Sequence, residues 1–172
     1  FFPLGFVENS IATNSALYLD GGSLYHFGIL CSTMHNAWVR TTCGRLKSDF
    51  RYSNTIVYNN YPWPGFAGEP LNDKHRTAIE QAAQCVLDAR AQFASSSLAD
   101  LYDPLTMPPA LLKAHQKLDT AVDAAYQPSG GKKTYASDAE RVAFLFELYQ
   151  RITSLLPAPA IKKSRKTKAT ES

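Results

Sequence analysis

The sequence predicts an α+β protein, in which short β segments and one long helix precede a domain of about three helices. Up to about residue 64, short runs rich in aromatic and β-branched residues are interrupted by Asn, Ser and Gly. From residue 74 onward, apolar residues instead recur at steps of three and four, the period of an amphipathic helix. The chain has 172 residues, of which 45% are hydrophobic, so it is long and apolar enough to bury a core.

Two short strands are expected near the beginning of the chain, over 2–7 and 16–19. A long helix is then expected over 23–42, because one face of it would carry a continuous stripe made of Leu24, Phe27, Cys31, Met34, Trp38 and Thr41. Gly44 follows at the place where helices often end in a left-handed residue. This helix is the main element expected in the first half.

A strand is expected directly after this helix. Residues 45–52 alternate strictly between charged and uncharged side chains, which is the period of a β-strand. Residues 55–60 would form its partner, with a turn at Ser53 and Asn54.

Three helices are expected in the second half of the chain. The first covers 74–93 and carries an apolar stripe on one face. The second begins at the proline pair 108–109, where a missing N–H costs little. The third begins at the capping box 137–140 and ends before Pro157, which cannot continue a helix.

Composition divides the chain into three segments. We expect a first domain at 1–64, a helical domain at 65–156 and a basic, flexible tail at 157–172. Their net charges are +1, −2 and +4, so the basic character of the chain lies in its tail. This distribution excludes a globally basic nucleic-acid-binding protein.

Composition also excludes several classes of protein. There is no run of about 18 apolar residues, so we expect no membrane partner. Cys31, Cys43 and Cys85 form a sparse, odd set without the second ligand pair of a zinc site, which favours free thiols and no metal. The chain begins with Phe1 and lacks the basic region of a signal peptide. We therefore expect a cytoplasmic protein and a part of a longer chain.

The alternating segment 45–52 is the best candidate for a functional site. In an extended strand, four charged residues would share one face: Arg45, Lys47, Asp49 and Arg51. Lysine donates to guanine O6 and N7 and aspartate accepts from cytosine N4, so Lys47 and Asp49 could together read one G·C pair. Arg45 and Arg51 would contact phosphates or further bases. The same pattern is typical of a solvated sheet face, and the residues alone leave both interpretations open.

No catalytic constellation accompanies these residues. His26, His35 and His115 lack a paired carboxylate or lie in an apolar stripe, which favours structural roles. The aromatic group at 58–66 could stack on bases, but it is more typical of a seam between subdomains. The sequence also lacks a nucleophile elbow and a glycine-rich phosphate loop.

Five strings follow one another along the chain in a distinctive order. They are YHFGIL at 25–30, MHNAWVR at 34–40, CGRLKSDFRYS at 43–53, IVYNNYPWP at 56–64 and LYDPLTMPP at 101–109. Together they resemble the C-terminal end of MmeI-like DNA methyltransferases. The resemblance extends from about residue 1 to residue 153 and does not cover the tail.

The resemblance implies a place within a larger bacterial enzyme of restriction–modification systems. In this family a class I methyltransferase domain, which uses S-adenosylmethionine to methylate adenine N6, lies upstream in the same chain. Residues 1–64 would then end a target-recognition domain, and 65–156 would form the helical C-terminal domain. No catalytic or cofactor-binding motif of the family falls on this chain, so it would hold no cofactor and would be inactive alone.

The resemblance also implies a role for Lys47 and Asp49, because the corresponding two positions after the Gly-Arg-Leu string help to choose one base pair. We therefore expect a fragment that recognises double-stranded DNA. The alternative is a helical interaction or dimerisation module that does not read DNA directly. The net charge of −2 over 65–156 favours this alternative, since an acidic surface does not attract phosphates.

Overall fold

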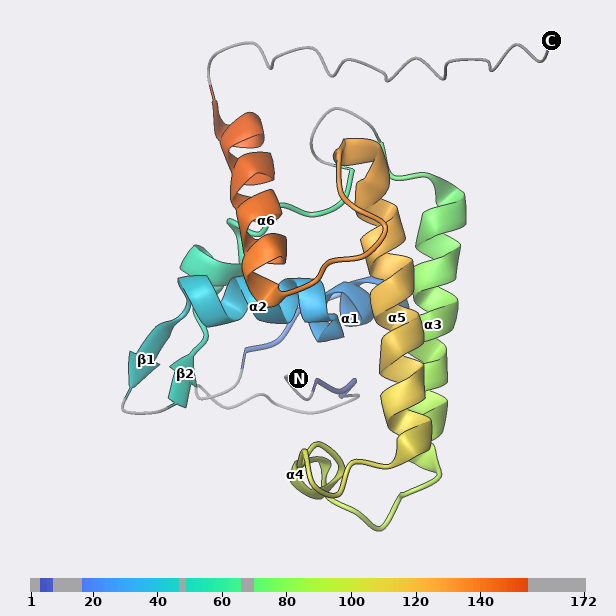
Figure 1. The fold of residues 1–172 in the computed structure, drawn as a ribbon. Coiled ribbons are helices and arrows are strands. Elements are labelled where there is room, and N and C mark those ends of the chain that lie inside the picture. Colours follow the sequence, from blue (N-terminus) through green and yellow to red (C-terminus); the bar gives the residue numbers. More distant parts are fainter. Residues whose placement is uncertain (1–3, 8–16, 47–48, 66–69, 155–172) are drawn as a thin grey trace, which may run out of the picture.

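The computed structural model describes residues 4–7, 17–46, 49–65 and 70–154 (Figure 1). Six helices are present among them: α1 (Leu24–Cys31), α2 (Thr33–Thr42), α3 (Asp73–Ala91), α4 (Leu98–Leu101), α5 (Pro109–Tyr126) and α6 (Asp138–Thr153). The other elements are short, and they are β1 (Gly44–Leu46), β2 (Asp49–Arg51), the π-helical turn η1 (Asn54–Tyr58) and the 3-10 turn η2 (Gln127–Ser129). Within this described part, every helix is too short or too polar to cross a lipid bilayer.

The three helices expected after residue 64 are present as α3, α5 and α6, with the short α4 between the first two. Figure 1 shows α3 and α5 side by side and antiparallel, and this is the most extensive helix pair of the structure. Pro109 is the first residue of α5, and the side chain of Ser137 caps α6 by accepting a hydrogen bond from the Glu140 N–H. The tail predicted at 157–172 lies outside the described residues.

The first half is less regular than the sequence predicts. The described parts of the two early strands, 4–7 and 17–19, are not in strands, so that prediction is wrong for them. The rest of both segments lies outside the described residues. The β structure of the described residues is confined to β1 and β2, which form one antiparallel pair.

The helix expected over 23–42 is two helices, because the backbone leaves the helical conformation at Ser32. Ser32 has φ −71° and ψ 157°, and its hydroxyl accepts a hydrogen bond from the His35 N–H at 3.2 Å. The N–H of Thr33 donates to the Asp119 carboxylate of α5 at 2.7 Å. These bonds satisfy donors at the beginning of a new helix. A contact between the two halves therefore divides a stripe that looks continuous in sequence.

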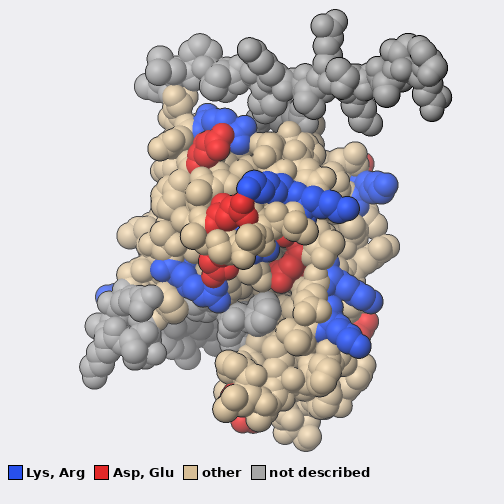
Figure 2. Space-filling view, in the orientation of Figure 1, with Lys and Arg blue, Asp and Glu red and all other residues tan. Residues whose placement is uncertain are grey.

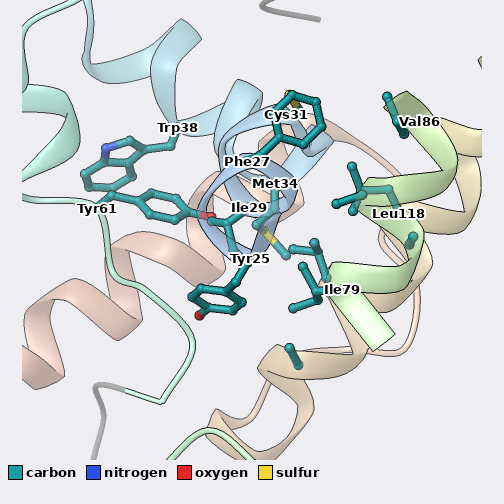
Figure 3. Close-up of a cluster of buried hydrophobic side chains, with 14 of the residues drawn as sticks. Tyr25, Phe27, Ile29, Cys31, Met34, Trp38, Tyr61, Ile79, Val86 and Leu118 are labelled. Carbon is teal, nitrogen blue, oxygen red and sulfur yellow. The ribbon is translucent and has the colours of Figure 1, made fainter. Parts of the chain in front are cut away.

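The apolar core is shared by both halves of the chain (Figure 3). α1 packs against α3 and α5, and α2 packs against α6. The side chains of Ile29, Ile79 and Leu118, from α1, α3 and α5, are fully buried in one cluster. Side chains from both sides of residue 64 thus pack together in one core. The division of the chain into two domains at this residue stays a prediction.

A buried arginine joins the second half to the beginning of the chain. Arg90 of α3 is 9% exposed, and its Nη1 donates to the Leu4 carbonyl at 2.5 Å. Its Nε donates to the Tyr102 hydroxyl at 2.8 Å, and this hydroxyl lies 2.7 Å from Nε2 of His115. The guanidinium also lies over the ring of Phe27, 5.2 Å from its centroid. This network places the first described segment against the helices.

Gly28 allows α1 to lie close to α3 and α5. A Cβ added to Gly28 would lie 2.7 Å from Cγ2 of Ile79 and 3.2 Å from Cδ1 of Leu118. Both neighbours are fully buried, so neither has free space to move into. A residue without a side chain is therefore required at this crossing of helices.

Replacing Gly28 by alanine is expected to lower the free energy of unfolding by about 1–3 kcal/mol. The added methyl group overpacks the core, and this outweighs the better helix propensity of alanine. Urea denaturation followed by circular dichroism measures the change. The matched control is Gly5→Ala, because a Cβ on Gly5 has no neighbour within 4 Å. Equal stability of the two variants would contradict the close packing at Gly28.

Candidate nucleic-acid interface

The β1–β2 hairpin directly follows α2 and carries the candidate site (Figure 1). Its strands are antiparallel, with three pairs in register: Gly44 with Arg51, Arg45 with Phe50, and Leu46 with Asp49. The chain reverses between Leu46 and Asp49, so the prediction of one continuous strand over 45–52 is wrong. The predicted partner strand over 55–60 is also wrong, because Asn54–Tyr58 forms the π-helical turn η1.

Polar side chains explain why η1 is a turn and not a strand. The Ser53 hydroxyl accepts a hydrogen bond from the Ile56 N–H at 3.3 Å, and Oδ1 of Asn54 accepts one from the Thr55 N–H at 2.9 Å. The amide of Asn60 donates to the carbonyl of Thr55 at 2.9 Å. Serine and asparagine side chains compete for backbone groups in this way, and they favour turns over sheet ladders.

The four charged residues predicted to read DNA do not lie along one strand. Arg45 belongs to β1, whereas Asp49 and Arg51 belong to β2. Arg51 is exposed. Lys47 lies outside the described residues, between the two strands, and the DNA-binding role of all four stays a prediction.

A buried histidine of α2 contacts the end of the hairpin. His35 is 2% exposed, and its Nδ1 lies 3.0 Å from the Leu30 carbonyl oxygen. A carbonyl oxygen only accepts, so Nδ1 carries the proton and Nε2 is the acceptor of the neutral ring. Tyr52, the residue after β2, donates its hydroxyl proton to Nε2 at 3.2 Å. The structural role of His35 agrees with the role expected from the sequence, but the sequence did not indicate Tyr52 as its partner.

Burial fixes the protonation state of both partners. Desolvation lowers the pKa of His35 to about 4, although the hydrogen bond to Leu30 acts in the opposite direction. Desolvation also raises the pKa of Tyr52 above its ordinary value. The imidazole is therefore neutral and the phenol protonated at pH 7, which gives this hydrogen bond a single direction.

Trp38, one turn further along α2, holds the segment that follows the hairpin. Its Nε1 donates to the Val57 carbonyl of η1 at 3.0 Å, and both residues are buried. The ring of Tyr61, just beyond η1, lies edge-on to His35 with 4.9 Å between centroids. The sequence places Trp38 on the buried face of a helix, and this indicates that its side chain makes a buried contact. It does not indicate that the partner is Val57.

The described aromatic residues at 58–65 pack among themselves and against the helices. The ring of Trp63 lies 5.6 Å from that of Tyr58 and 5.5 Å from that of Tyr61, measured between centroids. The hydroxyl of Tyr126 in α5 lies 2.8 Å from that of Tyr61. These contacts agree with the interpretation of the group as a seam between parts of the fold. Phe66 lies outside the described residues.

Among the described residues, charge and metal-binding groups single out no other site. Figure 2 shows acidic and basic side chains interspersed on the face in view. The part of the chain that the structure describes contains no cluster of three or more His, Cys, Asp or Glu residues that could hold a metal ion. Cys31 is buried, Cys43 is partly buried and Cys85 is exposed, and all three thiols are free.

Two family models match consecutive parts of this chain. The model described as the MmeI target recognition domain matches residues 1–65, which include the hairpin. The model described as the MmeI C-terminal domain matches residues 71–157, which include α3, α5 and most of the core that they share with α1. The chain is thus a target-recognition segment joined to a helical C-terminal domain. It belongs to the MmeI family, as the five strings of its sequence indicate.

Two relatives show how much of a longer protein this chain represents. It is 38% identical over 154 residues to DNA methyltransferase A of Bacillus subtilis (strain 168), covering 89% of this chain and 16% of that protein. The solved structure of the Type IIL restriction-modification enzyme MmeI in complex with DNA matches with a TM-score of 0.70 and 50% identity, covering 78% of this chain and 17% of that one. The chain spans about a sixth of the length of each relative.

Acidification is expected to destabilise the fold. Burial lowers the pKa of both His35 and His115 to about 4, below the ordinary value of 6.5. As the pH falls from 6.5 to 4, the unfolded chain binds protons at these residues and the folded chain does not, so stability is lost. Asp123 acts in the opposite direction, because burial raises its pKa to about 6 and its protonation favours the folded state.

Burial also raises the pKa of Asp119. The two histidines outweigh these two carboxylates, so we expect the free energy of unfolding to be about 2 kcal/mol lower at pH 5 than at pH 7.5. Urea titrations at the two pH values measure this difference. The ring signals of both histidines in NMR spectra should also stay unshifted between these pH values. Equal or greater stability at pH 5 would contradict the neutral, buried state of the two rings.

Proposed function

We propose that this chain is the DNA-recognition part of a site-specific adenine-N6 methyltransferase of a restriction–modification system. The β1–β2 hairpin contacts the base edges of double-stranded DNA, and the helical half helps to hold the duplex. An upstream domain of the same chain supplies the methyl-transfer chemistry. The segment described here chooses the target and transfers no methyl group itself.

The position of the hairpin is the observation that carries this proposal. It begins directly after the buried helix α2, and Tyr52 at its other end is bonded to the buried His35. It also lies within the residues that the target recognition domain model matches. A two-stranded ribbon fits the major groove of B-DNA, where every base pair presents a distinct pattern of donors and acceptors.

Lys47 and Asp49 supply a donor and an acceptor for the bases. The lysine ammonium donates to guanine O6 and N7, and the aspartate carboxylate accepts from the cytosine N4 amino group. Together they read the two bases of one G·C pair, at about 1–3 kcal/mol of discrimination per good contact. Arg45 and Arg51 contact phosphates or further bases on either side.

The two relatives support the other parts of the proposal. The name of the Bacillus subtilis protein supports methyl transfer, and the DNA in the MmeI structure supports DNA as the partner. S-adenosylmethionine is then the methyl donor of the longer protein. Its site does not fit the described residues, which include no glycine-rich loop between a strand and a helix.

A second candidate function rests on apolar side chains that the helical half exposes around α4. Leu105 is 93% exposed, and Leu98 and Leu112 are 39% and 41% exposed. Large apolar side chains that are exposed close together in the sequence favour contact with another protein, including a second copy of the chain. Analytical ultracentrifugation with and without duplex DNA separates the two functions, because a dimer that binds no DNA favours the interaction module.

Exchange of the reading pair is expected to change the DNA sequence that is methylated. The variant carries Lys47→Glu and Asp49→Arg together, in the full-length protein that contains this chain. Glutamate accepts from cytosine and arginine donates to guanine, so the preferred base pair changes at one position of the motif. Methylome sequencing of cells that express the variant identifies the new motif.

The matched control carries Lys113→Glu and Glu147→Lys together, a charge exchange at exposed positions of α5 and α6 that also keeps the net charge and should leave the motif unchanged. If the double variant still methylates the original motif, the assignment of Lys47 and Asp49 fails. If both variants alter the motif in the same way, the effect does not come from base reading by Lys47 and Asp49.

A further inference from the structure

We infer that Tyr52 and His35 form a positioning pair, which sets the angle of the β1–β2 hairpin and thereby the accuracy with which it discriminates bases. The inference rests on the proposed function, since it concerns how the same hairpin reads DNA. Neither residue needs to touch DNA for this role. Both act through the backbone that carries Asp49 and Arg51.

The hairpin is too small to hold its own orientation. It consists of three residue pairs, and two-stranded ribbons of this kind are marginally stable alone. Its direction relative to the rest of the chain therefore depends on what holds its two ends. One end continues from α2 at Cys43, and the other end leaves at Tyr52.

The first end is held because α2 is held. The Cys43 N–H donates to the Val39 carbonyl at 2.9 Å, which continues the helical pattern up to the first strand. The side chain of Val39 is fully buried, and that of Trp38 packs on Phe146 of α6 with 5.1 Å between ring centroids. β1 thus starts from the end of α2, where the buried Val39 and the packed ring of Trp38 hold the helix in place.

The second end is held by the His35 ring, which is itself fixed by its neighbours. The His35 ring is bonded to Leu30 through Nδ1, and its backbone N–H is bonded to the Ser32 hydroxyl at 3.2 Å. The edge-on ring of Tyr61 closes another side of it. Nε2 is the only lone pair that the neutral ring offers, and Tyr52 is its partner. The Tyr52 hydroxyl therefore has one well-defined place.

Distance makes this contact matter for base reading. Tyr52 is three residues from Asp49, or about 10 Å along a strand at about 3.3 Å per residue. A rotation of about 6° at Tyr52 would displace the Asp49 backbone by about 1 Å over that length. Hydrogen bonds to base edges weaken steeply with such errors in distance and angle, and recognition sites tolerate only about half an ångström.

The test removes one oxygen atom. Tyr52→Phe keeps the ring and its packing but loses the hydrogen bond to His35. In the full-length protein, we expect the ratio of methylation rates between the preferred site and a site changed at the position read by Lys47 and Asp49 to fall roughly threefold to tenfold. The rate at the preferred site should fall less, and the melting temperature should stay within a few degrees.

A second measurement reports on the hairpin without DNA. In the 172-residue chain, amide hydrogen exchange of β1 and β2 should become faster in Tyr52→Phe, whereas exchange in α5 should not change. The control is Tyr18→Phe, which removes the phenol oxygen of an exposed tyrosine that precedes α1. This control should leave both measurements as in the unchanged protein.

The outcomes separate this inference from the proposed function. Unchanged discrimination and unchanged exchange in Tyr52→Phe, in a protein that methylates a specific motif, would overturn the positioning pair alone. A full-length protein that methylates no specific motif would overturn the proposed function and, with it, the effect on base reading. An equal loss of discrimination in Tyr18→Phe would also overturn the inference, because the effect would not depend on the bond to His35.

Discussion

The arrangement of the described chain depends on one carboxylate, that of Asp119 in α5, which caps the beginning of α2. It accepts hydrogen bonds from the Thr33 N–H at 2.7 Å and the Thr33 hydroxyl at 2.6 Å. Burial raises the pKa of Asp119 above its ordinary value, although the two hydrogen bonds from Thr33 act in the opposite direction. The positive end of the α2 dipole also attracts the carboxylate. Because the two residues are 86 positions apart, the helical half sets the direction in which α2 points.

Side-chain packing then holds the C-terminal end of α2 in place. The ion pair between Arg40 and Asp138 contributes little, because both side chains are 44% exposed and water screens the charges. The contacts of Trp38 are more important, since it donates a hydrogen bond to Val57 of η1 and its ring packs against the rings of Phe146 and Tyr149 in α6. The hairpin inherits its orientation from a helix that is fixed at its beginning by a cap and at its end by aromatic packing.

The sequence predicts those elements whose signals are local. α5 begins at Pro109 and α6 follows the Ser137 cap, so both could be located from neighbouring residues. The break at Ser32 could not, because its cause is a carboxylate from another helix. The hairpin was misread as one strand, since strict alternation describes a long strand and a tight pair of short strands equally well. The alternation of charges was enough to select Lys47 and Asp49 as candidates. The hydrogen bond between Tyr52 and His35 at the base of the hairpin could be seen only in the fold.

The distribution of charge explains why a rigid base of the β1–β2 hairpin would matter for the proposed function. General affinity for DNA depends on how many phosphates a protein neutralises. Residues 1–64 have a net charge of +1 and residues 65–156 a net charge of −2, so this part of the protein has little electrostatic attraction for a duplex. Its contribution must then come from a few directional contacts, and such contacts discriminate only when their geometry is fixed before binding. A hairpin bonded at its base to a buried, neutral histidine meets that requirement without adding positive charge.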